Sequence, residues 1–183
     1  MRFYHDDIDK FRTELANGMD PNLTFYLASA SLGCYLDEAI KFGISDIAHL
    51  LIAAGADPNR TDMLASPLMQ ASNHGELDVM EDLIEHGANV NEVSGSKYTP
   101  MSRAFTTGDV EVIKMLIEHG GSVEIAVQST PQQMYRLFHH LRGTDVDRYL
   151  QSQGIIFKFT CVTAGVPKEA PPTPALSCRM PPH

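Results

Sequence analysis

Histidine is the residue of this sequence that could most directly serve catalysis or metal binding, and the chain has eight of them. His86 and His119 each stand directly before a glycine, 33 residues apart. They either contribute to a metal site or complement the carboxyl end of a helix and its dipole. His139 and His140 are adjacent, so on a helix they point to different faces and make poor joint ligands. We favour the helix-end interpretation and predict no metal site.

The cysteines offer little chemistry. Cys34, Cys161 and Cys178 are too few and too scattered for a disulfide framework, which favours a reducing, cytoplasmic setting. No nearby basic group indicates that any of them is an activated nucleophile. The sequence also lacks G-x-S-x-G, a Walker loop, H-E-x-x-H and C-x-x-C. It therefore predicts a protein that is not an enzyme, with no catalytic residue and no cofactor.

Asn22 and Asn59 both match the acceptor sequence for N-glycosylation. Residues 1–10 are too acidic and polar for a signal peptide, so we expect neither asparagine to carry a glycan. No stretch of the chain approaches the roughly 18 apolar residues that a membrane helix needs. We therefore expect no contact with a membrane.

Net charge excludes one further class of partner. The 183 residues carry 14 Lys+Arg against 23 Asp+Glu, a net charge of −9, which argues against nucleic-acid binding by phosphate neutralisation. Residues 1–125 hold 20 acidic and 8 basic side chains, and residues 61–96 hold no lysine or arginine. Such a field favours a partner with a basic patch, although it also fits a surface that is simply solvated.

An internal repeat organises the chain. Residues 66–91 align with residues 99–124 at an offset of 33, with ten identities in 26 positions. Residues 34–59 align with residues 66–91 at an offset of 32, with nine identities. Three related units therefore follow one another along the chain.

Each unit predicts a pair of short helices. Ser66 followed by Pro67 is typical of a helix start, and Gly75 of a left-handed helix end. A second helix is expected from about Asp78 to His86, because its apolar residues share one face. One such pair cannot bury that face alone, so the copies must stack.

These units resemble ankyrin repeats. The sequences SPLMQA (66–71) and TPMSRA (99–104) match the family's T-P-L-H-x-A, and the helix ends GADPN (55–59), GANVN (87–91) and GGSVE (120–124) match its G-A-D-V-N. The resemblance implies an all-α solenoid of about three clear repeats with degenerate helical caps at both ends. The expected units are a capping repeat over 1–29, repeats over 30–62, 63–94 and 95–128, a helix pair with an apolar flap over 129–166, and a proline-rich tail over 167–183.

The caps are expected from fainter copies of the pattern. A helix over 7–16 ending in NGMDPN (17–22) indicates the first, and a pair over about 131–141 and 145–153 indicates the last. Residues 155–163 are β-branched and aromatic, which predicts a strand-like flap over the final pair. The tail holds six prolines in 17 residues and is expected to be extended and mobile. Its Lys168, Pro171 and Pro174 match a polyproline ligand, although we favour a simple tail.

The sequence departs from the family pattern in three ways. The signature histidine is replaced by Asp37, Met69 and Ser102, and Cys34-Tyr35 stands where Thr-Pro is expected. The loop from Asn22 to Cys34 is four residues longer than its counterpart from Asn91 to Thr99. These changes leave the architecture standing and lower the expected stability.

The resemblance also implies a binding surface made of loop tips and the exposed side of each first helix. Apolar side chains on polar loops are typical of an interface centre. We predict a set of partner-binding residues on that surface: Phe25, Tyr26, Phe42, Arg60, Asp62, Met63, Leu64, Gln70, Asn73, His74, Tyr98, Arg103, Thr106 and Thr107. The same positions include Leu27, Glu38, Lys41, Thr61, Glu92, Val93, Ser94 and Lys97.

Two alternatives stay open. Phe25, Tyr26 and Leu27 either belong to the interface or fold back to cap the first repeat. The protein is expected to be a monomer that binds one protein partner as an adaptor or inhibitor, or as an immunity-type neutraliser or an intracellular effector. The rival class is an enzyme or metal protein with a pocket around His74, Asp37 or Glu38. A structural fragment of a larger protein is a further possibility.

Overall fold

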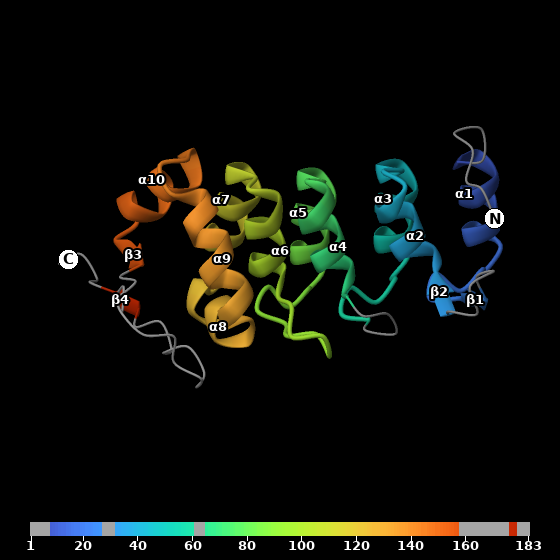
Figure 1. Cartoon of the computed structure of the whole chain (residues 1–183). Helices are drawn as coiled ribbons and strands as arrows, with labels where there is room; N and C mark the ends of the chain where they lie inside the picture. The colour runs from blue at the N-terminus through green and yellow to red at the C-terminus, as the bar shows by residue number, and fades with distance from the viewer. Residues whose placement is uncertain (1–7, 27–31, 61–64, 158–175, 179–183) are drawn as a thin grey trace.

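The computed structural model describes residues 8–26, 32–60, 65–157 and 176–178 of the 183-residue chain. Its helices stand side by side as successive pairs, with the N-terminal and C-terminal elements at opposite ends of the row (Figure 1). Within these ranges, no helix combines the length and the apolar character that a membrane span requires.

Three helix pairs correspond to the three predicted repeats. Each consists of a first helix, a tight turn and a second helix. The pairs are α2 (Tyr35–Lys41) with α3 (Ser45–Ala53), α4 (Pro67–His74) with α5 (Leu77–Glu85), and α6 (Pro100–Thr107) with α7 (Val110–Glu118). The first helices pack on one another in the order α2, α4, α6, and the second helices in the order α3, α5, α7. We call these two rows the first-helix layer and the second-helix layer.

Helix boundaries follow from the residues predicted to set them. The Thr99 hydroxyl accepts the Ser102 N–H (3.0 Å), and the Ser102 hydroxyl accepts the Thr99 N–H (2.8 Å), which satisfies two donors at the start of α6. Gly108 ends α6 with a φ of 73°, which lies in the left-handed region that favours glycine. Ser102 replaces the signature histidine, so this departure from the pattern is accommodated by a capping box.

The core runs between the two layers without interruption. Leu36, Ile47, Leu83, Met101 and Leu116 are among the side chains that contribute to it, and all are almost fully removed from solvent. Because each helix pair buries its apolar face against its neighbours, removing one pair would expose the core of the next.

Both predicted caps are present. Helix α1 (Ile8–Ala16) packs on α3, and its Phe11 ring meets the Tyr35 ring edge-on at 5.2 Å between centroids. At the other end, α9 (Pro131–Leu141) packs on α6, and α10 (Asp145–Ser152) packs on α7. The faint sequence copies at the two ends therefore predicted real helices.

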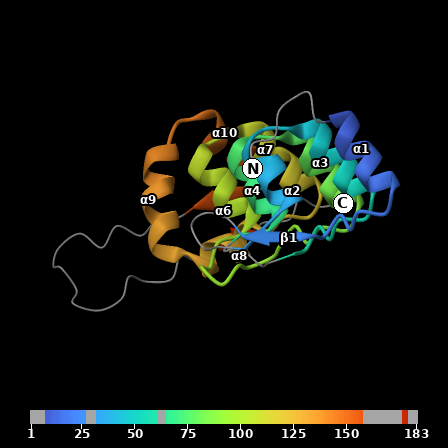
Figure 2. The same ribbon diagram turned by 90° about the vertical axis from the view of Figure 1, so that its right-hand side faces the viewer.

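Helix α8 (Val123–Ser129) was not predicted. The alignment of the repeats predicts a helix end at GGSVE (120–124). Instead, Ser122 caps a new helix, because its hydroxyl accepts the Ile125 N–H (3.2 Å). Both views place α8 along the same edge of the array as strand β1 (Thr24–Tyr26) (Figures 1 and 2). After the third repeat, a helix therefore occupies the edge that loops occupy earlier in the array.

The long first loop and the tail contain short strands. Strand β1 pairs antiparallel with β2 (Leu32–Cys34), so the extra residues of this loop form a hairpin. Strand β3 (Ile155–Phe157) follows α10 and pairs antiparallel with β4 (Leu176–Cys178). The prediction of a strand after α10 is confirmed for residues 155–157, while Cys161 lies outside the described residues. The tail was expected to be extended and mobile; its residues 176–178 are extended and pair with β3.

Candidate functional site

The loops between repeats are held in a fixed position by three asparagines. In each case the side-chain amide donates to a glycine carbonyl of the following repeat, and the side-chain oxygen accepts a backbone N–H two residues beyond that glycine. The sets are Asn22 with Gly55 (3.3 Å) and Asp57 (2.7 Å), Asn59 with Gly87 (2.8 Å) and Asn89 (2.7 Å), and Asn91 with Gly120 (2.9 Å) and Ser122 (2.7 Å). Asn22 and Asn59, which match the glycosylation sequence, are thus part of a structural ladder.

The predicted binding residues on the first helices lie at matching positions of successive repeats. Phe42, His74 and Thr107 each end or follow their helix, and all three are exposed. Phe42 is 57% exposed and stands out as an aromatic side chain in water. Gln70, Asn73 and Arg103 are half-buried, and Thr106 is exposed. The structure therefore brings these seven residues together on the first-helix layer.

Glu38 and Lys41 form an ion pair in the same layer, with 3.1 Å between Lys41 Nζ and Glu38 Oε1. Glu38 is only 4% exposed, whereas the Lys41 side chain remains half-exposed and its Nζ also lies 5.4 Å from the centroid of the Phe42 ring. Among these three predicted positions, Glu38 is therefore unavailable to a partner, and Lys41 and Phe42 are accessible.

The third loop, residues 92–98, is the most completely described loop tip. The buried Ser94 closes it, because the Ser94 N–H donates to the Tyr98 carbonyl (2.9 Å) and the Ser94 hydroxyl accepts the Tyr98 N–H (3.1 Å). Lys97 adopts a positive φ of 68° at the turn and is exposed. The Arg103 guanidinium lies over the Tyr98 ring, 4.0 Å from its centroid. Tyr98 and Arg103 are thus held together by a loop that is itself pinned.

Arg60 has a structural role that its predicted position in a loop tip did not suggest. Its Nη1 donates to the Asn22 carbonyl, which ties the second loop to the first. Sequence reasoning assigned this guanidinium to a partner, but a backbone carbonyl of the neighbouring repeat engages it. Arg60 is half-buried as a result.

Cys34 lies at the start of α2, where its Sγ takes the place of the usual cap hydroxyl. The thiol donates to Asp37 Oδ2 (3.1 Å), and Sγ accepts the Asp37 N–H (3.4 Å). Burial of the thiol, followed by the nearby Asp37 charge, raises the pKa of Cys34 to about 12. The thiol therefore stays protonated at neutral pH, and it is not an activated nucleophile.

Several predicted residues cannot be placed. Asp62, Met63 and Leu64 lie outside the described residues, as do Leu27 and Thr61. The backbone of Phe25 and Tyr26 belongs to β1, but their side chains are not described. The choice between an interface and a capping role for the first loop therefore stays open.

Comparison with known protein families identifies the same repeats that the fold shows. The family model for ankyrin repeats (three copies) matches residues 36–129, about half of the chain. The chain belongs to the ankyrin-repeat family. The resemblance deduced from SPLMQA and TPMSRA is thereby confirmed, together with the helical solenoid fold.

Individual relatives match only part of this chain and a smaller part of their own length. The chain is 34% identical to an ankyrin repeat protein of fowlpox virus (strain NVSL) over 102 residues, 55% of this chain and 34% of that protein. It is 51% identical to the ankyrin repeat and SOCS box protein 2 of Rattus norvegicus over 43 residues, 24% and 6% of the two chains. It is 33% identical to a glycerophosphocholine phosphodiesterase of Schizosaccharomyces pombe over 84 residues, 45% of this chain and 7% of the enzyme. The matched region spans about a third of these relatives or less.

The two layers of this ankyrin array differ in charge. Helices α3, α5 and α7 carry seven carboxylates and one lysine, and α5 alone contains Asp78, Glu81, Asp82 and Glu85. In α2, α4 and α6 the acidic residues are Asp37 and Glu38, and each is only 4% exposed. The strongly acidic part of the sequence therefore lies mainly on the second-helix layer, away from the predicted binding residues.

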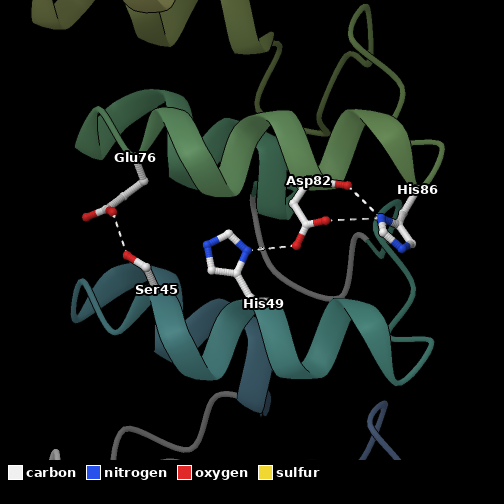
Figure 3. A network of polar contacts seen from close by, with 5 residues as sticks. All are labelled: Ser45, His49, Glu76, Asp82 and His86. Atoms are coloured by element: carbon white, nitrogen blue, oxygen red, sulfur yellow. Dashed lines mark hydrogen bonds and ion pairs between the residues drawn. The ribbon is translucent and has the colours of Figure 1, made fainter.

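Some of those acidic groups connect neighbouring repeats. His49 of α3 and Asp82 of α5 approach to 2.8 Å between Nδ1 and Oδ2, and the Ser45 hydroxyl donates to Glu76 Oε2 (3.0 Å) (Figure 3). His86 Nδ1 lies 2.8 Å from the Asp82 carbonyl oxygen and 3.4 Å from its Oδ1 (Figure 3). His119 repeats the contact at the Met115 carbonyl (2.9 Å). The helix-end interpretation of His86 and His119 is confirmed.

The rival interpretation, an enzyme or metal protein, rests on Asp37, Glu38 and His74. In the described part of the chain, no group of three or more histidine, cysteine or carboxylate side chains could hold a metal ion. Asp37 and Glu38 are buried in α2, whereas His74 is exposed at the end of α4. The three residues named for that rival therefore differ in their access to solvent.

Proposed function

We propose that the chain is a non-catalytic module that binds a protein partner through its first-helix layer and third loop, as an adaptor or an inhibitor. Ankyrin repeats in general serve protein–protein interaction, and this chain contains three of them. The proposed contact residues are Phe42, Asn73, His74, Tyr98 and Arg103, with Gln70, Thr106 and Thr107 around them.

The observation that carries this proposal is the exposure of Phe42. A phenylalanine that is 57% exposed leaves most of its ring in water, and it occupies the position that His74 and Thr107 occupy in the next repeats. Large aromatic side chains contribute strongly to interfaces when a partner removes them from water. The pinned third loop supports the proposal further, because Tyr98 and Arg103 would lose little freedom on binding.

The cellular compartment, the oligomeric state and the charge of the partner are further proposals. A buried, protonated Cys34 is compatible with a reducing compartment, so we place the protein in the cytoplasm. We take it to be a monomer that can block, position or scaffold its partner. The basic partner expected from net charge loses its main support for this surface, because the exposed carboxylates of the helices lie mainly in the second-helix layer.

Affinity capture from a lysate of the source cells tests the proposal. The baits are the full chain, a Phe42→Ser/Tyr98→Ser variant, and a Glu81→Gln/Glu85→Gln control on the exposed side of α5. We expect a stoichiometric protein to be retained by the first and third baits and lost by the second. Circular dichroism establishes that all three are folded. Retention of the same protein by the Phe42→Ser/Tyr98→Ser bait, with loss from the α5 control, would show that binding uses the second-helix layer.

A further inference from the structure

The cations around the third loop identify the chemistry of the partner, given the binding surface proposed above. Arg103 projects from α6, and Lys97 lies in the adjoining loop. Within the described ranges, no ion pair involves either side chain, whereas Lys41, Lys114 and Arg148 each approach a carboxylate within 3.1 Å. Lys10 and Arg12 of α1 and Arg136 of α9 also make no ion pair within the described residues, so Arg103 and Lys97 are distinguished by their place beside the third loop, on a chain of net charge −9.

Arg103 is also held in a conformation suited to binding a carboxylate. A guanidinium that lies over an aromatic ring keeps its N–H groups at its edge, where they can bind a carboxylate through two parallel hydrogen bonds. The guanidinium lies 4.0 Å from the centroid of the Tyr98 ring, and Ser94 holds the backbone of Tyr98 in place. Part of the entropy cost of ordering Arg103 on binding is therefore already met.

The first-helix layer around this site exposes no competing negative charge on its helices. Asp37 and Glu38, its two acidic residues, are 4% exposed. Glu76 and Asp109 lie in the turns between first and second helices, where they accept hydrogen bonds from the Ser45 hydroxyl and from the first N–H groups of α7. The third loop begins with the half-buried Glu92, next to Val93, which is 43% exposed.

We propose that the partner presents an acidic segment to the third loop, with one carboxylate bound by Arg103 against Tyr98, a second near Lys97, and an apolar side chain against Val93. This inference names the partner class for the surface proposed above and rests on that proposal. It reverses the expectation from net charge, because the binding face is cationic although the molecule is acidic.

Selection of peptides from a displayed random library of about twelve residues tests the inference with the full chain as bait. The enriched peptides are synthesised, and their affinities are measured for the wild type, for Arg103→Gln/Lys97→Gln, and for Lys114→Gln. Lys114 is the matched control, because it lies on α7 in the second-helix layer and pairs with Glu111 at 2.7 Å. Thermal unfolding verifies that every variant is folded.

We expect net-acidic peptides whose affinity falls about tenfold in Arg103→Gln/Lys97→Gln and less than about twofold in Lys114→Gln. Raised salt should weaken the same complexes. Enrichment of basic or neutral peptides, or of acidic peptides indifferent to Arg103 and Lys97, would overturn the inference. A selection that enriches nothing would also overturn it, because acidic segments of this length are in the library.

A Phe42→Ser/Tyr98→Ser variant separates the two proposals. Non-acidic peptides that lose affinity in this variant would refute the acidic partner and leave the binding surface intact. If the peptides bind the Arg103→Gln/Lys97→Gln and Phe42→Ser/Tyr98→Ser variants with the affinity of the wild type, binding occurs elsewhere and the proposed surface is refuted.

Discussion

The first-helix and second-helix layers are built from the same repeats but differ in what their surfaces do. The second helices carry most of the exposed carboxylates and bridge neighbouring repeats through pairs such as His49–Asp82. The first-helix layer exposes the Phe42 ring, its Arg103 makes no ion pair within the described residues, and its own acidic residues are buried. This difference shows that the net charge of a repeat protein sums over both layers and does not describe the binding surface alone. The field felt by a partner depends on which layer it meets.

The largest effect should come from the core shared by the layers. Leu83 of α5 is fully buried, so Leu83→Ala should lower the free energy of unfolding by about 3 kcal/mol. Phe42→Ala, on the exposed side of the first-helix layer, should change it by about 0.5 kcal/mol or less. Urea unfolding of both variants measures the contrast. Equal losses would mean that Phe42 is packed in solution and that the distinction between the layers is wrong.

A second contrast separates asparagines that hold the array from those that face a partner. Asn59→Ala removes hydrogen bonds to Gly87 and Asn89 and should cost about 1–2 kcal/mol of stability. Asn73→Ala, in the middle of the first-helix layer, should leave stability nearly unchanged and weaken partner binding. Chemical denaturation and affinity measurements on the same two variants test both halves. Stability loss in Asn73→Ala equal to that in Asn59→Ala would assign Asn73 to the scaffold.

The free energy of unfolding should depend on pH in the alkaline range, because Cys34 lies buried at the start of α2. Because burial raises the pKa of Cys34 from 9.0 to about 12, the native state keeps the thiol protonated where the unfolded chain ionises. Its contribution to stability is therefore complete below about pH 9 and is lost progressively as the pH rises toward about 12. The unfolding free energy of the wild type should fall more steeply above pH 9 than that of Cys34→Ser. Parallel curves would show that the thiol is accessible to water.

The smallest effect concerns the contacts between second helices. A double-mutant cycle of His49→Ala and Asp82→Ala should give a coupling energy of about 0.5 kcal/mol, because both side chains are partly exposed. The single variants should not alter partner binding. A loss of affinity in either would bring the second-helix layer into the interface.

The helices and their order could be predicted from sequence because the residues that specify them are local. Ser66-Pro67, Gly75 and the apolar spacing of α5 define a helix pair without reference to the rest of the chain. Helix α8 was missed because Ser122 was interpreted through the repeat alignment. The spacing of Val123, Ala126 and Val127 is a helix signal that could have revealed it.

The places of the candidate residues in the fold could be predicted from sequence, but their contacts could not. Equivalence between repeats correctly brought Phe42, His74 and Thr107 together. No local pattern shows that Arg60 reaches the Asn22 carbonyl or that Glu38 is buried, because both depend on contacts between units distant in sequence. The place of the charge in the fold could not be predicted for the same reason, since its sum along the chain carries no information about which layer holds it.

Side-chain footprinting with hydroxyl radicals tests the central claim most directly, with the captured partner bound to the full chain. Phe42 and Tyr98 report on the proposed surface, and Tyr149 of α10, which packs beside Lys114 of α7, reports on the second-helix layer. We predict that the partner protects Phe42 and Tyr98 from modification and leaves Tyr149 unchanged. Protection of Tyr149 alone would contradict the account, because it would place the partner on the layer that we assign to holding the array together.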